Sequence, residues 1–338
     1  MENEKPFPNE KKPYILNVNA SSYIRINYDL DNWRALIEML KNPEGTRKIL
    51  NLNKAQLVND AMSLARVGKL PYNAALDVLD VFKHNEDHYV PWEAALGTLN
   101  YLGKRLLSDE THLDKFEHFV EHLLEDRYHS LTFDESDNDK HLDKLSRISV
   151  LNWMCKVGYS DCVAKSKTYF DDWKNNGNGV SPNMRDVVYN TAVRESNENW
   201  KFIHEKFQTV KVDSERLKYI HAMGSTEDET LLETFLNMTI KREESGIRLQ
   251  DCLYVFRDVS VNKVGRNVIM NWMESYYDEI YGAFVPNGGA AAGKFFLQFF
   301  FLKVYCILPI LKLQTQVLTV MPSQFLVELP QLPTLQTM

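Results

Sequence analysis

The segment His118-Phe-Val-Glu-His122 has the residue types and spacing of an inverted zinc-peptidase motif, His-x-x-Glu-His. On a helix the two histidines lie one turn apart on one face, where they could bind zinc beside Glu121. A structural interpretation competes with this one, because apolar residues at helical spacing form a core-facing stripe and leave the histidines at its flank. The sequence offers no convincing distal carboxylate ligand, so we predict no metal site here. The stripe consists of Leu113, Phe116, Phe119, Val120 and Leu123.

Two other histidine segments contain ligand-type residues. His84-Asn-Glu-Asp-His88 lacks the arrangement of a zinc-peptidase helix, and Pro91 follows closely. We interpret it as a loop before a helix that begins at Pro91, since proline favours the first helical position. His204-Glu-Lys-Phe-Gln208 begins like a zinc helix but has Gln208 where the second ligand belongs. The sequence therefore predicts no metal ligand and no cofactor in this chain.

Cys155 and Cys162 are seven residues apart and bracket Gly158, a turn residue. They are close enough to form a structural disulfide in an oxidising environment, and they would be plain thiols in the cytosol. A redox role is not expected without a Cys-x-x-Cys motif.

Asn19-Ala-Ser21 and Asn237-Met-Thr239 fit the N-glycosylation pattern, which also arises by chance. These patterns and the cysteines suit an exported protein. In contrast, Met1 to Lys12 is charged and lacks the apolar run of a signal peptide, which predicts a cytoplasmic location for the chain as written.

A third group of residues could contact a peptide or another domain: Gln250, Asp251, Arg257 and Arg266. In the functional interpretation they lie on a concave surface, where Arg257 or Arg266 steers a peptide carboxylate. In the structural interpretation this region caps helices and forms hydrogen bonds between repeats, with Asp251 and Arg266 in surface ion pairs. Both interpretations remain open from the sequence.

Composition and periodicity predict the fold. The chain has 338 residues, 44% hydrophobic and 25% charged, and its net charge of −7 with no basic patch argues against nucleic-acid binding. From residue 31 to 285, amphipathic helices follow one another with short breaks, which predicts a mostly α fold: an irregular α-solenoid of HEAT- or armadillo-like helix pairs. The expected helices include 57–66, 75–82, 91–102, 113–125, 142–154, 162–174, 182–194 and 199–207.

The two ends differ from the helical part. Residues 1–13 are expected to be disordered. Residues 14–30 are expected to hold a strand remnant of a preceding β-domain, because Tyr23 to Tyr28 alternates with period 2. Asp31 or Asn32 is the expected N-cap of the first helix.

Residues 286–338 form an apolar, atypical tail that is expected to be disordered or non-native. The segment 295–311 is a little short for a membrane span, and Lys303 at its centre would cost roughly 2.5–3.5 kcal/mol to insert. We therefore do not expect a span.

Several segments, in order along about residues 14–279, resemble the C-terminal helical domain of the aminopeptidase N family of zinc aminopeptidases, including the endoplasmic-reticulum aminopeptidases. They are Asn17 to Trp33, Gln56 to Arg66, Glu86 to Ala95, Cys155 to Cys162, Phe170 to Trp173, Arg185 to Tyr189, Gln250 to Phe256, and Asn262 to Arg266 with Trp272. One departure from the family concerns a second cysteine pair that many relatives have. It would fall near Asn190 and Met223, and neither position is a cysteine in this chain. The family's final helices also have no counterpart after residue 285.

The resemblance implies a helical domain that caps the peptide cavity of a zinc aminopeptidase. The zinc motif, His-Glu-x-x-His, belongs to an earlier catalytic domain and is absent from this chain. We therefore expect no catalytic residue here and no hydrolysis by the chain alone. The implied partners are a peptide, the catalytic and β-sandwich domains, and a second copy in a homodimer. Full-length relatives are often plasma-membrane or secretory proteins. The alternative is a stand-alone α-solenoid module or decoy that binds peptides or a full-length aminopeptidase.

Overall fold

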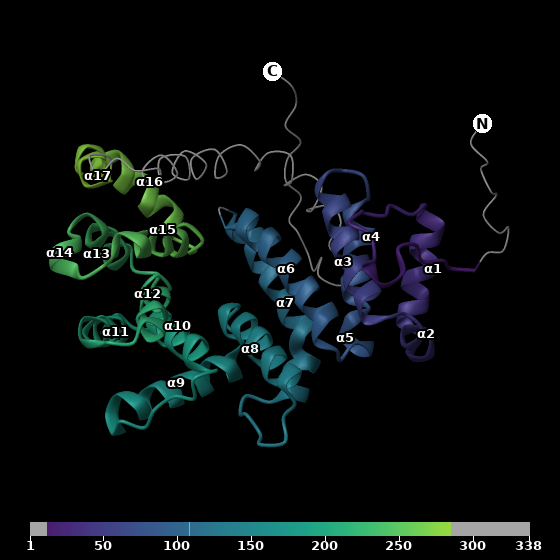
Figure 1. The fold of residues 1–338 in the computed structure, drawn as a ribbon, viewed down its shortest axis with the longest axis horizontal. Coiled ribbons are helices and arrows are strands. Elements are labelled where there is room, and N and C mark those ends of the chain that lie inside the picture. The colour runs from purple at the N-terminus through teal and green to yellow at the C-terminus, as the bar shows by residue number, and fades with distance from the viewer. Residues whose placement is uncertain (1–11, 108, 285–338) are drawn as a thin grey trace. The chain divides into compact units, whose positions relative to one another are not determined.

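The computed structural model describes residues 12–107 and 109–284 (Figure 1). Helices dominate these residues and no strand forms in them, so the prediction of a mostly α fold is confirmed. Residues 1–11 of the predicted N-terminal tail lie outside the described part, as do the predicted tail 286–338 and its apolar segment 295–311. The chain divides into two compact units near residue 100.

The first unit begins with an extended segment and the 3₁₀ turn η1 (Val18–Ala20). Its helices are α1 (Leu30–Lys41), α2 (Pro43–Lys48), α3 (Asn51–Arg66), α4 (Tyr72–Asp80), α5 (Phe82–Asn85) and the first part of α6 (Tyr89–Leu106). Trp33 and Trp92 are buried in its core, as the helical spacing of their neighbours predicts. Pro91 lies in the first turn of α6 rather than at its first position.

The first helix begins two or three residues earlier than expected. Asp29 is its N-cap and accepts a hydrogen bond from the Asn32 backbone N–H, at 2.8 Å. The predicted caps Asp31 and Asn32 are therefore wrong. Asn32 is buried instead, and its carboxamide bonds both the N–H and the carbonyl of Tyr14 at 3.0 Å. A side chain that is used for a long-range contact is not available as a cap.

The strand expected within residues 14–30 does not form in the described chain. With no neighbouring strand, the backbone groups of this segment need other partners. Side chains supply them: Asn53 Oδ1 accepts from the Asn19 N–H at 3.0 Å, and Asp60 Oδ2 accepts from the Ile26 N–H at 3.0 Å. Asn53 and Asp60 both lie on α3 and are buried. The extended segment is therefore held by a helix, and its origin in a β-domain stays a prediction.

The second unit contains the end of α6 and the remaining helices. They are α7 (Glu110–Leu131), α8 (His141–Lys156), α9 (Ser160–Asn176), α10 (Arg185–Glu195), α11 (Asn197–Thr209), α12 (Asp213–Met223), α13 (Glu229–Ile240), α14 (Arg242–Ser245), η2 (Leu249–Asp251), α15 (Cys252–Ser260), α16 (Gly265–Ser275) and α17 (Tyr277–Phe284). Each of α7 to α11 packs against the next helix along the chain, as Figure 1 shows by colour. α10 is central, because it contacts α8, α9, α11 and α12.

A close backbone approach fixes the start of α16. At Gly265, an added Cβ would lie 2.2 Å from the carbonyl oxygen of Val259, so only glycine fits there. The Asn262 side chain caps this turn by accepting from the N–H groups of Val264 and Gly265. Asn262 also donates to the carbonyls of Gly224 and Thr226, which ties this turn to the end of α12.

We predict that Asn53→Ala destabilises the first unit by about 1–3 kcal/mol, because it leaves the Asn19 N–H and the Asn17 carbonyl without the partner that holds them. Chemical denaturation measures the loss, and faster hydrogen exchange of the Asn19 amide locates it. Asn51→Ala, at the start of the same helix, is the matched control. Equal stability and equal exchange in the two variants would show that Asn53 does not hold the segment.

Candidate functional site

A cavity of about 350 Å³ lies within the second unit, between α7, α8, α10, α12 and α15. Its volume is in the range of small-molecule and peptide side-chain sites. Both signs of charge line it. The cations are Lys156, Arg194, Arg257 and Lys263, and the anions are Glu117, Asp186, Glu227 and Asp258.

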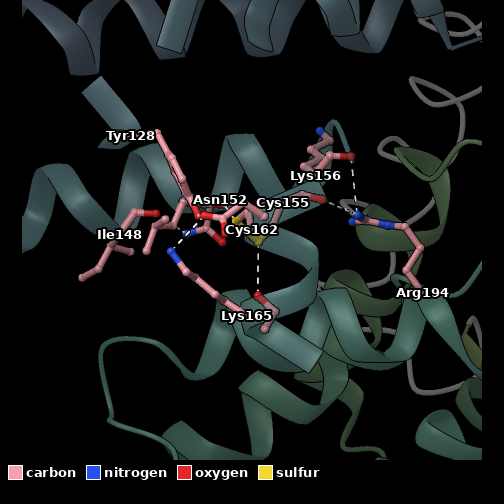
Figure 2. The surroundings of a disulfide bond; sticks show 11 residues. Tyr128, Ile148, Asn152, Cys155, Lys156, Cys162, Lys165 and Arg194 are labelled. Carbon is pink, nitrogen blue, oxygen red and sulfur yellow. Dashed lines mark hydrogen bonds and ion pairs between the residues drawn. A yellow bond between two sulfur atoms is a disulfide. The ribbon is translucent and has the colours of Figure 1, made fainter. Parts of the chain in front are cut away.

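Cys155 lines this cavity and forms a disulfide with Cys162 (Figure 2). It joins the last turn of α8 to the first turn of α9, with Cα atoms 5.2 Å apart. Gly158 makes the turn between them with φ of 83°, a conformation that favours glycine. Both cysteines are buried, and the Ser166 hydroxyl lies 3.2 Å from Cys155 Sγ.

Arg194 connects α10 to the C-terminal end of α8. Its Nη1 donates to the carbonyl oxygens of Cys155 at 3.0 Å and Lys156 at 3.4 Å (Figure 2). The Cys155 carbonyl also accepts from the Gly158 N–H at 3.3 Å, so Arg194 adds a second donor there. Both carbonyls lie at the negative end of the helix dipole, where a cation is favoured. Burial lowers the pKa of Arg194, which still remains a cation at neutral pH.

Lys156 is the last residue of α8 and has an unusual environment. Desolvation at the cavity wall lowers the pKa of its ammonium to about 8, and the nearby cations Arg194 and Lys104 act in the same direction. Lys156 is nonetheless an exposed residue, and its Nζ lies 5.2 Å from the ring centre of Trp153. Glu117, whose charge is opposite to that of Lys156, also lines the cavity and is half-buried. Burial raises the pKa of its carboxyl. The cavity thus holds an amine and a carboxyl whose charged forms are both disfavoured by their surroundings.

The opposite wall holds a hydrogen-bonded group of three side chains. Asp258 Oδ2 lies 2.6 Å from His221 Nδ1, and Arg257 Nη2 lies 3.1 Å from the same nitrogen. Arg257 also donates to Asp258 Oδ1 from Nε at 2.9 Å. These contacts hold the Arg257 guanidinium in place. Because Arg257 is mostly exposed, its guanidinium also remains accessible from the cavity.

Of the four predicted contact residues, the structure brings only Arg257 to the cavity. Gln250 is exposed on η2. Asp251 is buried and pairs with Arg248, whose Nε lies 2.7 Å from Asp251 Oδ2. Arg266 donates from Nη2 to the Lys104 carbonyl at 2.6 Å, which joins α16 to the end of α6. Asp251 is thus a buried partner of Arg248 and not a surface ion pair, and Arg266 bonds a backbone carbonyl of another helix.

Sequence reasoning missed Lys156, Arg194 and Glu117. Each belongs to a different helix, and only packing brings them to one cavity. Asn190 is a further missed residue, although its position had been marked by the absent second cysteine pair. It lines the cavity, and its Oδ1 has no hydrogen-bond partner among the described residues. Met223 is fully buried.

The described histidine side chains lie apart from one another or make other contacts. Within α7, His118 Nδ1 lies 3.8 Å from Glu121 Oε2, and the side chain of His118 is 64% exposed. His204 Nε2 lies 3.1 Å from Gln208 Nε2, and its ring stacks on Trp200. Among residues 12–107 and 109–284, no three His, Cys, Asp or Glu side chains are placed to hold a metal ion. The side chain of His84 lies outside the described part.

The sequence profile of the ERAP1-like C-terminal domain matches residues 13–300. The chain belongs to this family. The ERAP1-like C-terminal domain described here is therefore a C-terminal domain of the aminopeptidase N family, as the ordered segments indicated.

Three relatives illustrate the match of this ERAP1-like domain. It is 28% identical to the membrane alanyl aminopeptidase of Manduca sexta over 78% of the chain and 27% of the relative. It is 32% identical to the thyrotropin-releasing hormone-degrading ectoenzyme of Rattus norvegicus over 77% of the chain and 25% of the relative. It is 26% identical to human glutamyl aminopeptidase over 80% of the chain and 28% of the relative. The chain thus spans about a quarter of the length of the curated relatives it matches.

No helix in the described part of the ERAP1-like domain combines the length and the apolarity that a membrane crossing requires.

We predict that replacing the disulfide, as Cys155→Ala/Cys162→Ala, lowers the free energy of unfolding by about 2.5 kcal/mol, the loop-closure entropy expected for a separation of 7 residues. Chemical denaturation under non-reducing conditions measures it. Reductant should destabilise the wild type and leave the double variant unchanged. A double variant as stable as the oxidised wild type would contradict the prediction.

The lowered pKa of Lys156 predicts a pH dependence of stability. The folded chain releases this proton near pH 8, whereas the unfolded chain holds it up to about 10.5, so between these values the unfolded state binds more protons. The free energy of unfolding should therefore gain a rising contribution between pH 8 and 10.5. Urea denaturation across this range should show it in the wild type and in Lys201→Met, a control on α11, and should show a smaller rise in Lys156→Met. The same curve in all three proteins would refute the assignment.

Proposed function

We propose that this chain is the C-terminal part of an aminopeptidase N-like zinc metallo-aminopeptidase, and that its helical domain caps the peptide cavity of the complete enzyme. Family membership and the match to about a quarter of each relative support this proposal. The relatives' names give the reaction class, removal of N-terminal residues from peptides. The single observation that supports a contact with the peptide is the charged cavity of the second unit, with Arg257 at its wall.

The cavity chemistry suits a peptide. A peptide backbone offers both donors and acceptors, and its free C-terminus is a carboxylate that a guanidinium binds through two parallel hydrogen bonds. Arg257 is held by Asp258 and His221 and is open to solvent, so it can meet such a carboxylate without first losing its own orientation. Lys156 and Arg194 add positive charge to the same wall.

The zinc of the complete enzyme is not assigned to residues of this chain. The described residues lack a three-ligand cluster, and the full sequence lacks the His-Glu-x-x-His motif. In this proposal zinc and the general base belong to the catalytic domain, and the chain by itself positions peptides without cleaving them. Paired helices stacked as an irregular α-solenoid would give the curved wall that such a cap needs.

A hydrolysis assay tests the catalytic part of the proposal. The purified chain, supplied with zinc, should not cleave an aminoacyl anilide. Metal-dependent turnover that resists further purification would overturn it. Stoichiometric capture of a full-length aminopeptidase by the chain would instead favour the alternative, a stand-alone interaction module or decoy.

A binding assay tests the peptide contact. We expect Arg257→Gln to weaken binding of a fluorescent peptide with a free C-terminus by about tenfold, the loss of one charge-assisted interaction. Binding of the same peptide with an amidated C-terminus should be weak for both proteins. Arg34→Gln, an exposed change on α1, is the matched control and should bind like the wild type. An unchanged affinity in Arg257→Gln, with circular dichroism equal to wild type, would remove this residue from the contact.

A further inference from the structure

The two glycosylation patterns of the chain lie in very different structural settings. Asn19 is exposed and belongs to η1, the turn that follows the extended N-terminal segment. Asn237 belongs to α13 and is half-buried against α16. An N-linked oligosaccharide is bulky and hydrophilic, so it needs an asparagine whose side chain points into solvent.

The backbone of the turn at Asn19 is held by hydrogen bonds, while the Asn19 side chain is exposed to solvent. Asn19 has φ of 61° and ψ of 18°, the left-handed region that asparagine tolerates better than most residues. Its backbone N–H is held by buried Asn53, at 3.0 Å, and the Asn53 Nδ2 donates to the Asn17 carbonyl at 3.1 Å. Ser21, the hydroxyl residue of the pattern, is exposed as well. Backbone bonds therefore hold this turn, and a sugar on Asn19 Nδ2 would break none of them.

The carboxamide of Asn237 is hydrogen-bonded within the core. The Trp272 indole donates to Asn237 Oδ1 at 2.8 Å, and Trp272 is a buried core residue. Thr239, the hydroxyl residue of this pattern, is fully buried and donates to the Leu236 carbonyl at 2.7 Å. A sugar at Asn237 would disturb this contact between α13 and α16. A chain modified there would not reach the described fold intact.

We propose that Asn19 carries an N-linked oligosaccharide in the folded protein and that Asn237 does not. The disulfide at Cys155 suits an oxidising compartment, the kind of environment in which this modification takes place. The donor is a lipid-linked diphosphate oligosaccharide. A bond forms between Asn19 Nδ2 and the sugar C1, the bond from C1 to the diphosphate oxygen breaks, the lipid diphosphate leaves with the electron pair, and the amide nitrogen gives up one proton. This proposal does not depend on the peptide contact.

Expression of the full chain behind a secretory leader in animal cells tests the proposal. We expect the wild type and Asn237→Gln to carry the same single oligosaccharide, and Asn19→Gln and Ser21→Ala to carry none. Enzymatic deglycosylation should increase the mobility of the first two proteins alone, and mass spectrometry should find aspartate at position 19 and asparagine at position 237.

The protein is examined in the medium and in the lumenal membrane fraction. Because the oligosaccharide is attached before folding is complete, chains that are retained inside the cell also show whether Asn19 is modified. An unmodified Asn19 in both fractions overturns the proposal. An oligosaccharide on Asn237 in the secreted, protease-resistant chain also overturns it. Asn237→Gln is the matched control, because it removes the second pattern while glutamine keeps an amide near Trp272.

Discussion

The cavity wall depends on one capping interaction, the Arg194 guanidinium on the last carbonyls of α8. The end of an α-helix leaves carbonyl groups unpaired, and a buried helix end needs partners for them. Backbone N–H groups of the following turn pair with the carbonyls of Trp153, Met154 and Cys155. Arg194 adds donors to Cys155 and Lys156 from α10, the helix that contacts α8, α9, α11 and α12. The interaction therefore joins the end of α8 to α10 beside Lys156.

The disulfide acts on the same helix end from the other side. It closes the turn between α8 and α9, so the Cys155 carbonyl that Arg194 bonds belongs to a residue with little freedom. The result is a region of crowded positive charge, in which burial and neighbouring cations lower the pKa of Lys156 to about 8. The same burial raises the pKa of Glu117. Electrostatic features of this kind are common at binding sites, and here they follow from how two helix ends are joined.

The N-terminal segment shows a different solution to the same problem of unpaired backbone groups. An extended chain without a neighbouring strand bonds to buried side chains of α3, chiefly Asn53 and Asp60. The period-2 pattern of Tyr23 to Tyr28 predicted a strand because such patterns report which residues alternate in exposure, and they do not report whether a partner strand exists. The segment's exposed Tyr23 and Ile24 leave apolar surface on its outer side. In the proposed full-length enzyme the preceding domain would cover that surface.

The sequence by itself determined the helices, the buried stripe of α7, the cysteine spacing that allows a disulfide, and the family. These are local or ordered signals: helical periodicity repeats every three or four residues, and family segments follow one another along the chain. Tertiary structure alone decided which charged side chains share the cavity, since Arg194 and Lys156 belong to different helices and meet only through packing. It also decided that Arg266 bonds the Lys104 carbonyl, that Asp251 pairs with Arg248, and that Asn19 is exposed while Asn237 accepts from Trp272. Contacts between residues far apart in the chain depend on how helix faces fit together, and no local pattern records that fit.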